Sequence, residues 1–262
     1  MKTGILVVSF GTTHPETLEK NITAAENAIR ERFPAIPCFR AFTSTIVRRR
    51  LKEKLGISVP SPAEALAALA AEGYTHVAVQ PTLLLPGEEY DRLRREIFGS
   101  AGGMHISLGL PLLWDDRDTD TLVEILRESY SAGEDSVLLA MGHGTSHAAD
   151  AVYDRLRAGM HKVGMELCTV EGSLDFDSAV NALSAQSRRR VHLFPLLLVA
   201  GEHSVKDMAG SGEESLKSRL ERAGFSVTYS LQGLGELPAV REMIAARLPA
   251  LPDLRAAGAA PS

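Results

Sequence analysis

The stretch Pro195-Leu196-Leu197-Leu198-Val199-Ala200-Gly201-Glu202-His203 indicates that this chain contains a repeat, because a similar stretch stands earlier, at Pro81-Thr82-Leu83-Leu84-Leu85-Pro86-Gly87-Glu88-Glu89. The two stretches align without a gap at an offset of 114 residues. A shorter pair, Phe10-Gly11-Thr12 and His143-Gly144-Thr145, repeats near the start of each half. Self-similarity of this kind indicates a duplicated structural unit.

Both halves alternate between strand and helix patterns. In the first half, apolar runs predict strands near 4–9, 37–42, 77–85 and 106–110, with amphipathic or alanine-rich helices between them. Runs at 137–141, 168–171, 191–199 and 225–229 repeat this order in the second half. Near-continuous apolar strands between helices are typical of parallel sheets covered on both faces. The sequence therefore predicts an α/β fold of two similar domains, each a parallel sheet of about four strands flanked by helices, facing one another across a cleft.

The polar stretch 131–135 is the expected junction between the halves. It divides the chain into an N-terminal half at 1–132 and a C-terminal half at 133–250. The closing helix of either half, 118–130 or 237–247, is a candidate to pack on the opposite half. The alanine- and proline-rich stretch 251–262 is expected to be a disordered tail.

Composition excludes several classes of protein. The chain has 262 residues, of which 45% are hydrophobic, so it can bury a sizeable core. A formal net charge of −5 supplies no general attraction for nucleic acid. Cys38 and Cys168 both lie inside apolar segments and are expected to be buried thiols rather than a disulfide or metal ligands. No apolar run approaches the ~20 residues of a membrane helix, so a cytoplasmic protein without membrane or nucleic-acid partners is expected.

Two histidines stand where strands of the second half end. His143 follows the run 137–141, and His203 follows the run 191–199. The first half has Phe10 and Glu89 at the matching positions. The glycines around His143 could simply allow a tight bend, with the histidine incidental to it. However, imidazoles that served packing or turn geometry could have been kept in both halves, so the asymmetry favours chemistry in the second half.

Glu171 follows the strand at 168–171, between the two histidines in sequence. Because neighbouring parallel strands end at the same edge of a sheet, His143, Glu171 and His203 are expected to meet there. Two imidazoles and a carboxylate suit a divalent transition metal, with positions left for water or substrate. The alternative for Glu171 is an ordinary loop or helix-start carboxylate.

Five motifs together resemble the anaerobic cobalt chelatases that act on sirohydrochlorin. In chain order they are Val8-Ser9-Phe10-Gly11-Thr12, Arg40-Ala41-Phe42-Thr43-Ser44, Met141-Gly142-His143-Gly144, Val170-Glu171-Gly172, and Gly201-Glu202-His203 followed by Asp207-Met208-Ala209-Gly210. Each motif alone is weak, but their joint order spans nearly the whole chain.

The resemblance implies a class II chelatase fold and ATP-independent insertion of Co²⁺ into sirohydrochlorin, an early step of cobalamin biosynthesis. By the same resemblance, His143, Glu171 and His203 would bind the incoming metal. His143 and His203 would also help to remove the pyrrole protons as catalytic residues. The metal would be a substrate, with no further cofactor, and Fe²⁺, Ni²⁺ or Zn²⁺ could also occupy such ligands. The oligomeric state, including a homo-oligomer, stays open.

Sirohydrochlorin carries eight carboxylates, so hydroxyl and basic groups are expected around the ring. The first half supplies the candidates for tetrapyrrole binding, which are Ser9, Phe10, Gly11, Thr12, Arg40, Thr43, Ser44 and Glu89. Phe10 is expected to pack against the ring face rather than to bind metal.

Other functions remain open at this point. An iron- or nickel-inserting chelatase would use the same ligands, and so would a protein that binds metal or tetrapyrrole without turnover. A metal-dependent hydrolase is disfavoured, because the sequence contains neither an H-E-x-x-H nor a G-x-S-x-G pattern.

Overall fold

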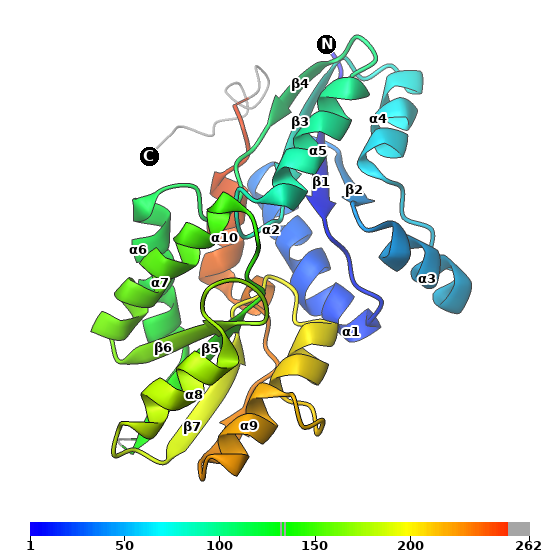
Figure 1. The fold of residues 1–262 in the computed structure, drawn as a ribbon. Coiled ribbons are helices and arrows are strands. Elements are labelled where there is room, and N and C mark those ends of the chain that lie inside the picture. Colours follow the sequence, from blue (N-terminus) through cyan, green and yellow to red (C-terminus); the bar gives the residue numbers. More distant parts are fainter. Residues whose placement is uncertain (132, 134, 251–262) are drawn as a thin grey trace. The chain divides into compact units, whose positions relative to one another are not determined.

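A computed structural model describes residues 1–131, 133 and 135–250 (Figure 1). The chain forms two compact units. The first comprises Met1–Trp114 and the described residues from Arg241 onward, and the second comprises Asp115–Val240. Each unit contains one four-stranded parallel sheet flanked by helices, which confirms the predicted fold class. The predicted cleft between the halves stays a prediction.

The first unit is built on a sheet with strand order β2-β1-β3-β4. Its strands are β1 (Thr3–Ser9), β2 (Cys38–Phe42), β3 (His76–Pro81) and β4 (His105–Leu108). Its helices before residue 115 are α1 (Pro15–Thr17), the π-helical segment η1 (Leu18–Thr23), α2 (Ala24–Arg32), α3 (Thr45–Leu55), α4 (Pro62–Ala71) and α5 (Glu88–Gly99).

The second unit repeats this topology with strand order β6-β5-β7-β8. Its strands are β5 (Ser136–Gly142), β6 (Met165–Thr169), β7 (Arg190–Pro195) and β8 (Ser226–Tyr229). Its helices are α6 (Asp116–Ser129), η2 (Ala148–Asp150), α7 (Ala151–Lys162), α8 (Phe176–Ser184), the π-helical segment η3 (Ser204–Met208), α9 (Leu216–Arg222) and η4 (Leu234–Glu236). The chain passes back to the first unit within α10 (Pro238–Ala246).

The central strand of each sheet is buried on both faces. In β5, Leu139 and Met141 belong to an apolar cluster with α8 and α9, while Leu138 and Ala140 alternate with them and are also buried. In β1, every residue is buried in the same way. Successive side chains of a strand point to opposite faces of the sheet, so both faces of β1 and β5 are packed against apolar residues. This packing gives the carboxyl edge of each sheet a rigid support.

The duplication also appears in the hydrogen bonds at the carboxyl edges. Equivalent pairs are Thr82 N–Val8 O and Leu196 N–Met141 O, Thr43 N–Ser9 O and Val170 N–Gly142 O, and Ser44 N–Phe10 O and Glu171 N–His143 O. Phe10 is therefore the counterpart of His143, and Ser44 is the counterpart of Glu171.

Two local predictions differ from the structure. The apolar runs 77–85 and 191–199 leave their strands at Pro81 and Pro195. Beyond Pro81 the carbonyls of Leu83 and Leu84 accept hydrogen bonds from a loop that follows β4, not from a strand. In addition, α3 was not predicted, because its basic sequence lacks a clear apolar face.

The boundary between the units also differs from the expected junction at 132. Helix α6 belongs to the second unit because it packs on α7, where Gly159 allows Val123 to approach and Arg155 pairs with Asp116 at 2.7 Å (Figure 1). Tyr130, which follows α6, stacks on Phe194 of β7 at 4.1 Å between ring centroids. The expected tail at 251–262 lies outside the described residues. Within the described part of the chain, no helix is long and apolar enough to cross a membrane.

Candidate functional site

The His143 turn is held against the Glu171 loop by glycine geometry. Gly144 has φ of +78°, and a Cβ built there would stand 1.6 Å from the carbonyl oxygen of Glu171. The Glu171 N–H donates to the His143 carbonyl at 2.8 Å. A side chain at position 144 would therefore push apart the two loops that carry these candidate ligands.

Tyr153 of α7 supports the same turn. Its ring is 2% exposed, and its phenol oxygen accepts hydrogen bonds from the backbone N–H groups of His143 and Gly144. Burial raises the pKa of Tyr153 to about 12, so the phenol is neutral at physiological pH. Tyr153 could not be recognised from the sequence, because a tyrosine on the apolar face of a helix indicates a core residue.

Asp150 joins the two loops through its carboxylate. One oxygen accepts from the Thr145 N–H at 3.3 Å, and the other accepts from Ser173 N at 3.0 Å and from Ser173 Oγ at 2.9 Å. A Cβ at Gly172 would collide with this carboxylate at 2.5 Å. Asp150 was not predicted as a site residue, and nothing in its sequence surroundings marks it.

His143 and His203 lie side by side. Their ring centroids are 4.7 Å apart with the rings perpendicular. His143 Nδ1 lies 2.9 Å from the Gly144 carbonyl oxygen, and His203 Nδ1 lies 2.6 Å from Asp207 Oδ2. A carbonyl or an ionised carboxylate only accepts hydrogen bonds, so Nδ1 is the donor in each ring. Each neutral imidazole therefore keeps its lone pair on Nε2, which is the atom available to a metal or a proton.

Glu171 reaches this pair through its backbone rather than through its carboxylate. The side chain of Glu171 is exposed, while its N–H is bonded to His143. Among the described residues, no group of three or more His, Cys, Asp or Glu side chains is placed to hold a metal ion. The structure thus brings together two of the three predicted ligands, and the role of Glu171 stays a prediction that requires its side chain to turn toward the imidazoles.

His147 does not share the setting of these histidines. Its N–H is bonded to Thr145 Oγ at 3.1 Å, just as the N–H of His14 in the first unit is bonded to Thr12 Oγ at 3.2 Å. Its Nδ1 accepts from Ala149 N at 3.1 Å at the start of η2. Both halves keep a histidine here, which fits a turn-forming role.

Four of the predicted tetrapyrrole-binding residues stand at the end of β1 or in the turns at the carboxyl edge of the first sheet. Ser9 is buried, and its Oγ accepts from Thr82 Oγ at 2.7 Å. Thr12 Oγ holds the His14 turn, and Ser44 Oγ caps α3 by accepting from Val47 N at 3.3 Å. Gly11, with φ of +99°, permits close packing on the Phe42 ring.

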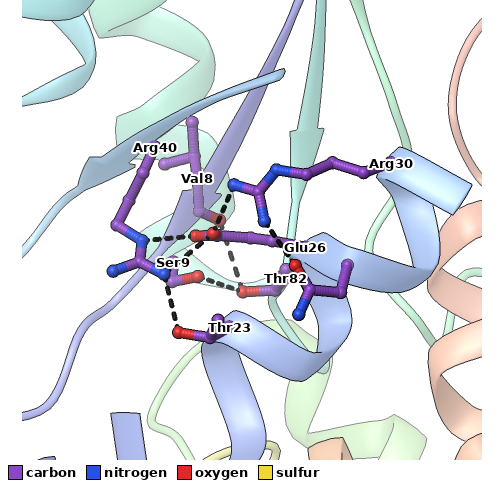
Figure 2. Close-up of polar contacts among 8 residues, drawn as sticks. Val8, Ser9, Thr23, Glu26, Arg30, Arg40 and Thr82 are labelled. Atoms are coloured by element: carbon purple, nitrogen blue, oxygen red, sulfur yellow. Dashed lines mark hydrogen bonds and ion pairs between the residues drawn. The ribbon is translucent and has the colours of Figure 1, made fainter. Parts of the chain in front are cut away.

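Arg40 forms an internal ion pair (Figure 2). Its Nε lies 2.6 Å from Glu26 Oε1, and one terminal nitrogen lies 2.8 Å from both Glu26 Oε2 and Thr23 Oγ. Arg30 also binds Glu26 Oε2 at 2.9 Å, so two guanidinium groups neutralise a fully buried carboxylate. Much of the hydrogen-bonding capacity of Arg40 is therefore used within the protein.

Phe10, Thr43 and Glu89 are arranged differently. The Phe10 ring is 50% exposed, whereas Thr43 Oγ1 and Glu89 Oε1 are buried without a hydrogen-bond partner. A large exposed aromatic side chain at the carboxyl edge of a sheet is suited to contact a flat ligand.

The cysteines are free and not reactive. Cys168 is buried, and Cys38 is partly buried. Burial raises the pKa of both thiols, that of Cys38 to about 11, so neither supplies a thiolate for metal at neutral pH.

Solved structures of other proteins share this architecture of two α/β units. SirB from Bacillus subtilis with Fe3+ superposes with a TM-score of 0.63 at 18% identity, covering 94% of each chain. CbiX, described as the terminal enzyme for biosynthesis of siroheme in denitrifying bacteria, gives 0.56 at 16% identity over 98% of this chain and 100% of its own. At these identities the likeness concerns the fold.

The sequence comparisons are more specific. Residues 3–251 match the family described as cobalt chelatase (CbiK). A sirohydrochlorin cobaltochelatase of Salmonella typhimurium is 39% identical over 252 residues, covering 95% of this chain and 96% of the relative. The sirohydrochlorin cobaltochelatase CbiKC of Nitratidesulfovibrio vulgaris is 36% identical over 90% of this chain and 85% of its own. The chain belongs to the cobalt chelatase (CbiK) family.

Proposed function

We propose that this chain inserts Co²⁺ into sirohydrochlorin without ATP, at the site formed around His143 and His203. The observation that carries the proposal is the contact between these two imidazoles, with each Nδ1 held by an acceptor. Family membership supplies the reaction type, and the two curated relatives supply the substrates.

The reaction requires the metal to lose water and the macrocycle to lose two N–H protons. Two Nε2 lone pairs hold the ion loosely, with Glu171 as the third ligand, while the ring nitrogens take over coordination. Each imidazole that gives up the metal regains a lone pair and accepts one pyrrole proton. The product is the metallated ring, and the two protons pass from the imidazoles to water. Bringing metal and ring together in one site removes much of the entropic cost of their encounter.

We propose that residues of the first unit contact the sirohydrochlorin macrocycle. Phe10 packs against the macrocycle face, because its ring is exposed at the carboxyl edge of β1. Thr43 and Glu89 offer buried oxygens without partners at the same edge. Ser9, Gly11, Thr12 and Ser44 shape the turns, and Arg40 contributes the part of its guanidinium that Glu26 and Thr23 leave unbound.

A metal-by-metal chelation assay with purified protein and sirohydrochlorin tests the proposal. We expect multiple turnovers with Co²⁺, followed by the absorption change of the macrocycle, and loss of most turnover in His143→Ala and His203→Ala. His147→Ala is the matched control and should keep nearly the parental rate, because this histidine serves a turn that both halves share.

Other outcomes would replace the proposal. Faster turnover with Fe²⁺ or Ni²⁺ than with Co²⁺ would make the chain a chelatase for that metal. Stoichiometric binding without turnover would make it a metal or tetrapyrrole carrier. A folded His203→Ala protein, checked by circular dichroism, that inserts cobalt at the parental rate would remove the histidine pair from the mechanism.

A further inference from the structure

A carboxylate contact accompanies the second histidine of the site. Asp207 Oδ2 lies 2.6 Å from His203 Nδ1, and the two side chains are 40% and 45% exposed. The distance is short for an N–H···O bond and fits a charge-assisted one. Nδ1 must be the donor, because an ionised carboxylate only accepts.

Both members of this contact are specific to the second half of the chain. The ungapped offset of 114 residues relates His203 to Glu89, and continued by four residues it relates Asp207 to Leu93. Leu93 lies in α5 and is completely buried in the apolar cluster of the first unit, which also includes residues of α4. The duplicated fold therefore does not need a carboxylate at this position, and the exchange of leucine for aspartate coincides with the exchange of glutamate for histidine.

The backbone around Asp207 is well anchored. His203 stands directly before the π-helical segment η3. Ala209, the residue that follows this segment, donates its N–H to the Ser204 carbonyl at 3.2 Å. Ser204 and Met208 are completely buried on either side of Asp207. Single-turn π-helical segments occur often at functional sites. The backbone position of Asp207 is thus set by the fold of the segment and by its buried neighbours.

We propose that Asp207 is a positioning residue that holds His203 in the tautomer with hydrogen on Nδ1, so that Nε2 is presented to the metal. An imidazole without such a partner exchanges between its two neutral tautomers, and only one of them offers Nε2 as a ligand. This inference rests on the proposed function in one respect, because that function identifies the metal as the ion that Nε2 binds. His143 needs no carboxylate, because the Gly144 carbonyl holds its Nδ1.

The tautomer itself is measured in the metal-free protein by ¹⁵N NMR of histidine-labelled samples. In the parent, His203 should show a protonated Nδ1 and an unprotonated Nε2. Asp207→Ala should give averaged shifts from both tautomers. Asp207→Asn should restore the parental pattern, because the amide oxygen still accepts from Nδ1. Glu166→Gln is the matched control, since Glu166 pairs with His161 Nδ1 at 3.1 Å in the same unit.

Cobalt binding is the second readout, measured by titration of the same metal-free proteins with Co²⁺ alone. Loss of such a carboxylate partner commonly weakens metal affinity by about 10- to 100-fold. We expect that range for Asp207→Ala, a smaller loss for Asp207→Asn, and the parental affinity for Glu166→Gln. In the chelation assay, the KM for Co²⁺ should rise more than kcat falls.

Two failures can be told apart. If Asp207→Ala, folded by circular dichroism, keeps both the parental ¹⁵N pattern and the parental cobalt affinity while His203→Ala loses cobalt, the positioning role is wrong and the site stands. If His203→Ala keeps the parental cobalt affinity, the proposed metal site is wrong. A tautomer change in Asp207→Ala without any loss of cobalt affinity also overturns the positioning role.

Discussion

Removing the carboxylate of Asp150 should damage the site more than it damages the fold. Asp150→Ala deletes the acceptor shared by Thr145 N, Ser173 N and Ser173 Oγ, and therefore uncouples the loop of His143 from the loop of Glu171. The contact from Thr145 N at 3.3 Å is long, so most of the stabilisation comes from the two contacts to Ser173 at 3.0 and 2.9 Å. Hydrogen bonds to a charged group contribute about 1.5 to 3 kcal/mol each, and the low end applies to a partly exposed group.

We therefore expect Asp150→Ala to lose about 2 to 3 kcal/mol of unfolding free energy. For a protein of this size the corresponding fall in Tm is roughly 5 to 10 °C. Misplacing a reacting group by about 1 Å can cost about 100-fold in rate. At a temperature well below Tm, we expect kcat/KM for chelation to fall by at least about tenfold.

The assay pairs thermal unfolding by circular dichroism with chelation kinetics at 25 °C. Asp115→Ala is the control, because Asp115 caps α6 of the same unit by accepting from Asp118 N at 3.1 Å. Loss of this cap should cost about 1 kcal/mol and leave chelation unchanged. The reasoning is refuted if Asp150→Ala inserts metal as fast as the control variant Asp115→Ala does.

Three further predictions test the support of each unit. Gly144→Ala should cost about 3 kcal/mol in urea unfolding, because the new Cβ would meet the Glu171 carbonyl at positive φ; a loss under about 1 kcal/mol would contradict this geometry. Burial raises the pKa of Tyr153 from 10 to about 12, so its contribution to stability is complete below pH 10 and falls by about 2 to 3 kcal/mol as pH rises through 12. Tyr153→Phe should flatten this decline when urea unfolding is measured at successive pH values, and equal slopes for the two proteins would refute the assignment. Glu26→Gln should cost about 3 kcal/mol in chemical denaturation, because Arg40 and Arg30 lose their buried partner, whereas Glu16→Gln at an exposed pair should change nothing measurable.

Part of the site was predictable from the sequence because it depends on strand ends. His143 directly follows β5, and parallel strands bring their carboxyl ends to one edge. His203 follows the apolar run that contains β7, so the sequence predicted its approach to that edge, although the loop after Pro195 sets its final position. In the structure the two ring centroids lie 4.7 Å apart, and their role as metal ligands stays a prediction. The comparison between the halves added which positions are specialised, since Phe10 and Glu89 replace the imidazoles. The placement of the Glu171 carboxylate could not be predicted, because it depends on side-chain rotation in an exposed loop.

The alternation of strands and helices, the duplication and the histidine pair could be predicted from the amino-acid order, because apolar periodicity and repetition are properties of the chain taken in order. The folded structure was needed to show that Arg40 binds Glu26, that Tyr153 and Asp150 hold the His143 turn, and that α6 joins the second unit. These contacts depend on which side chains meet after the chain has folded. A carboxylate, a phenol or a helix face has the same local pattern whichever partner it finds, so the choice of partner lies in the packing.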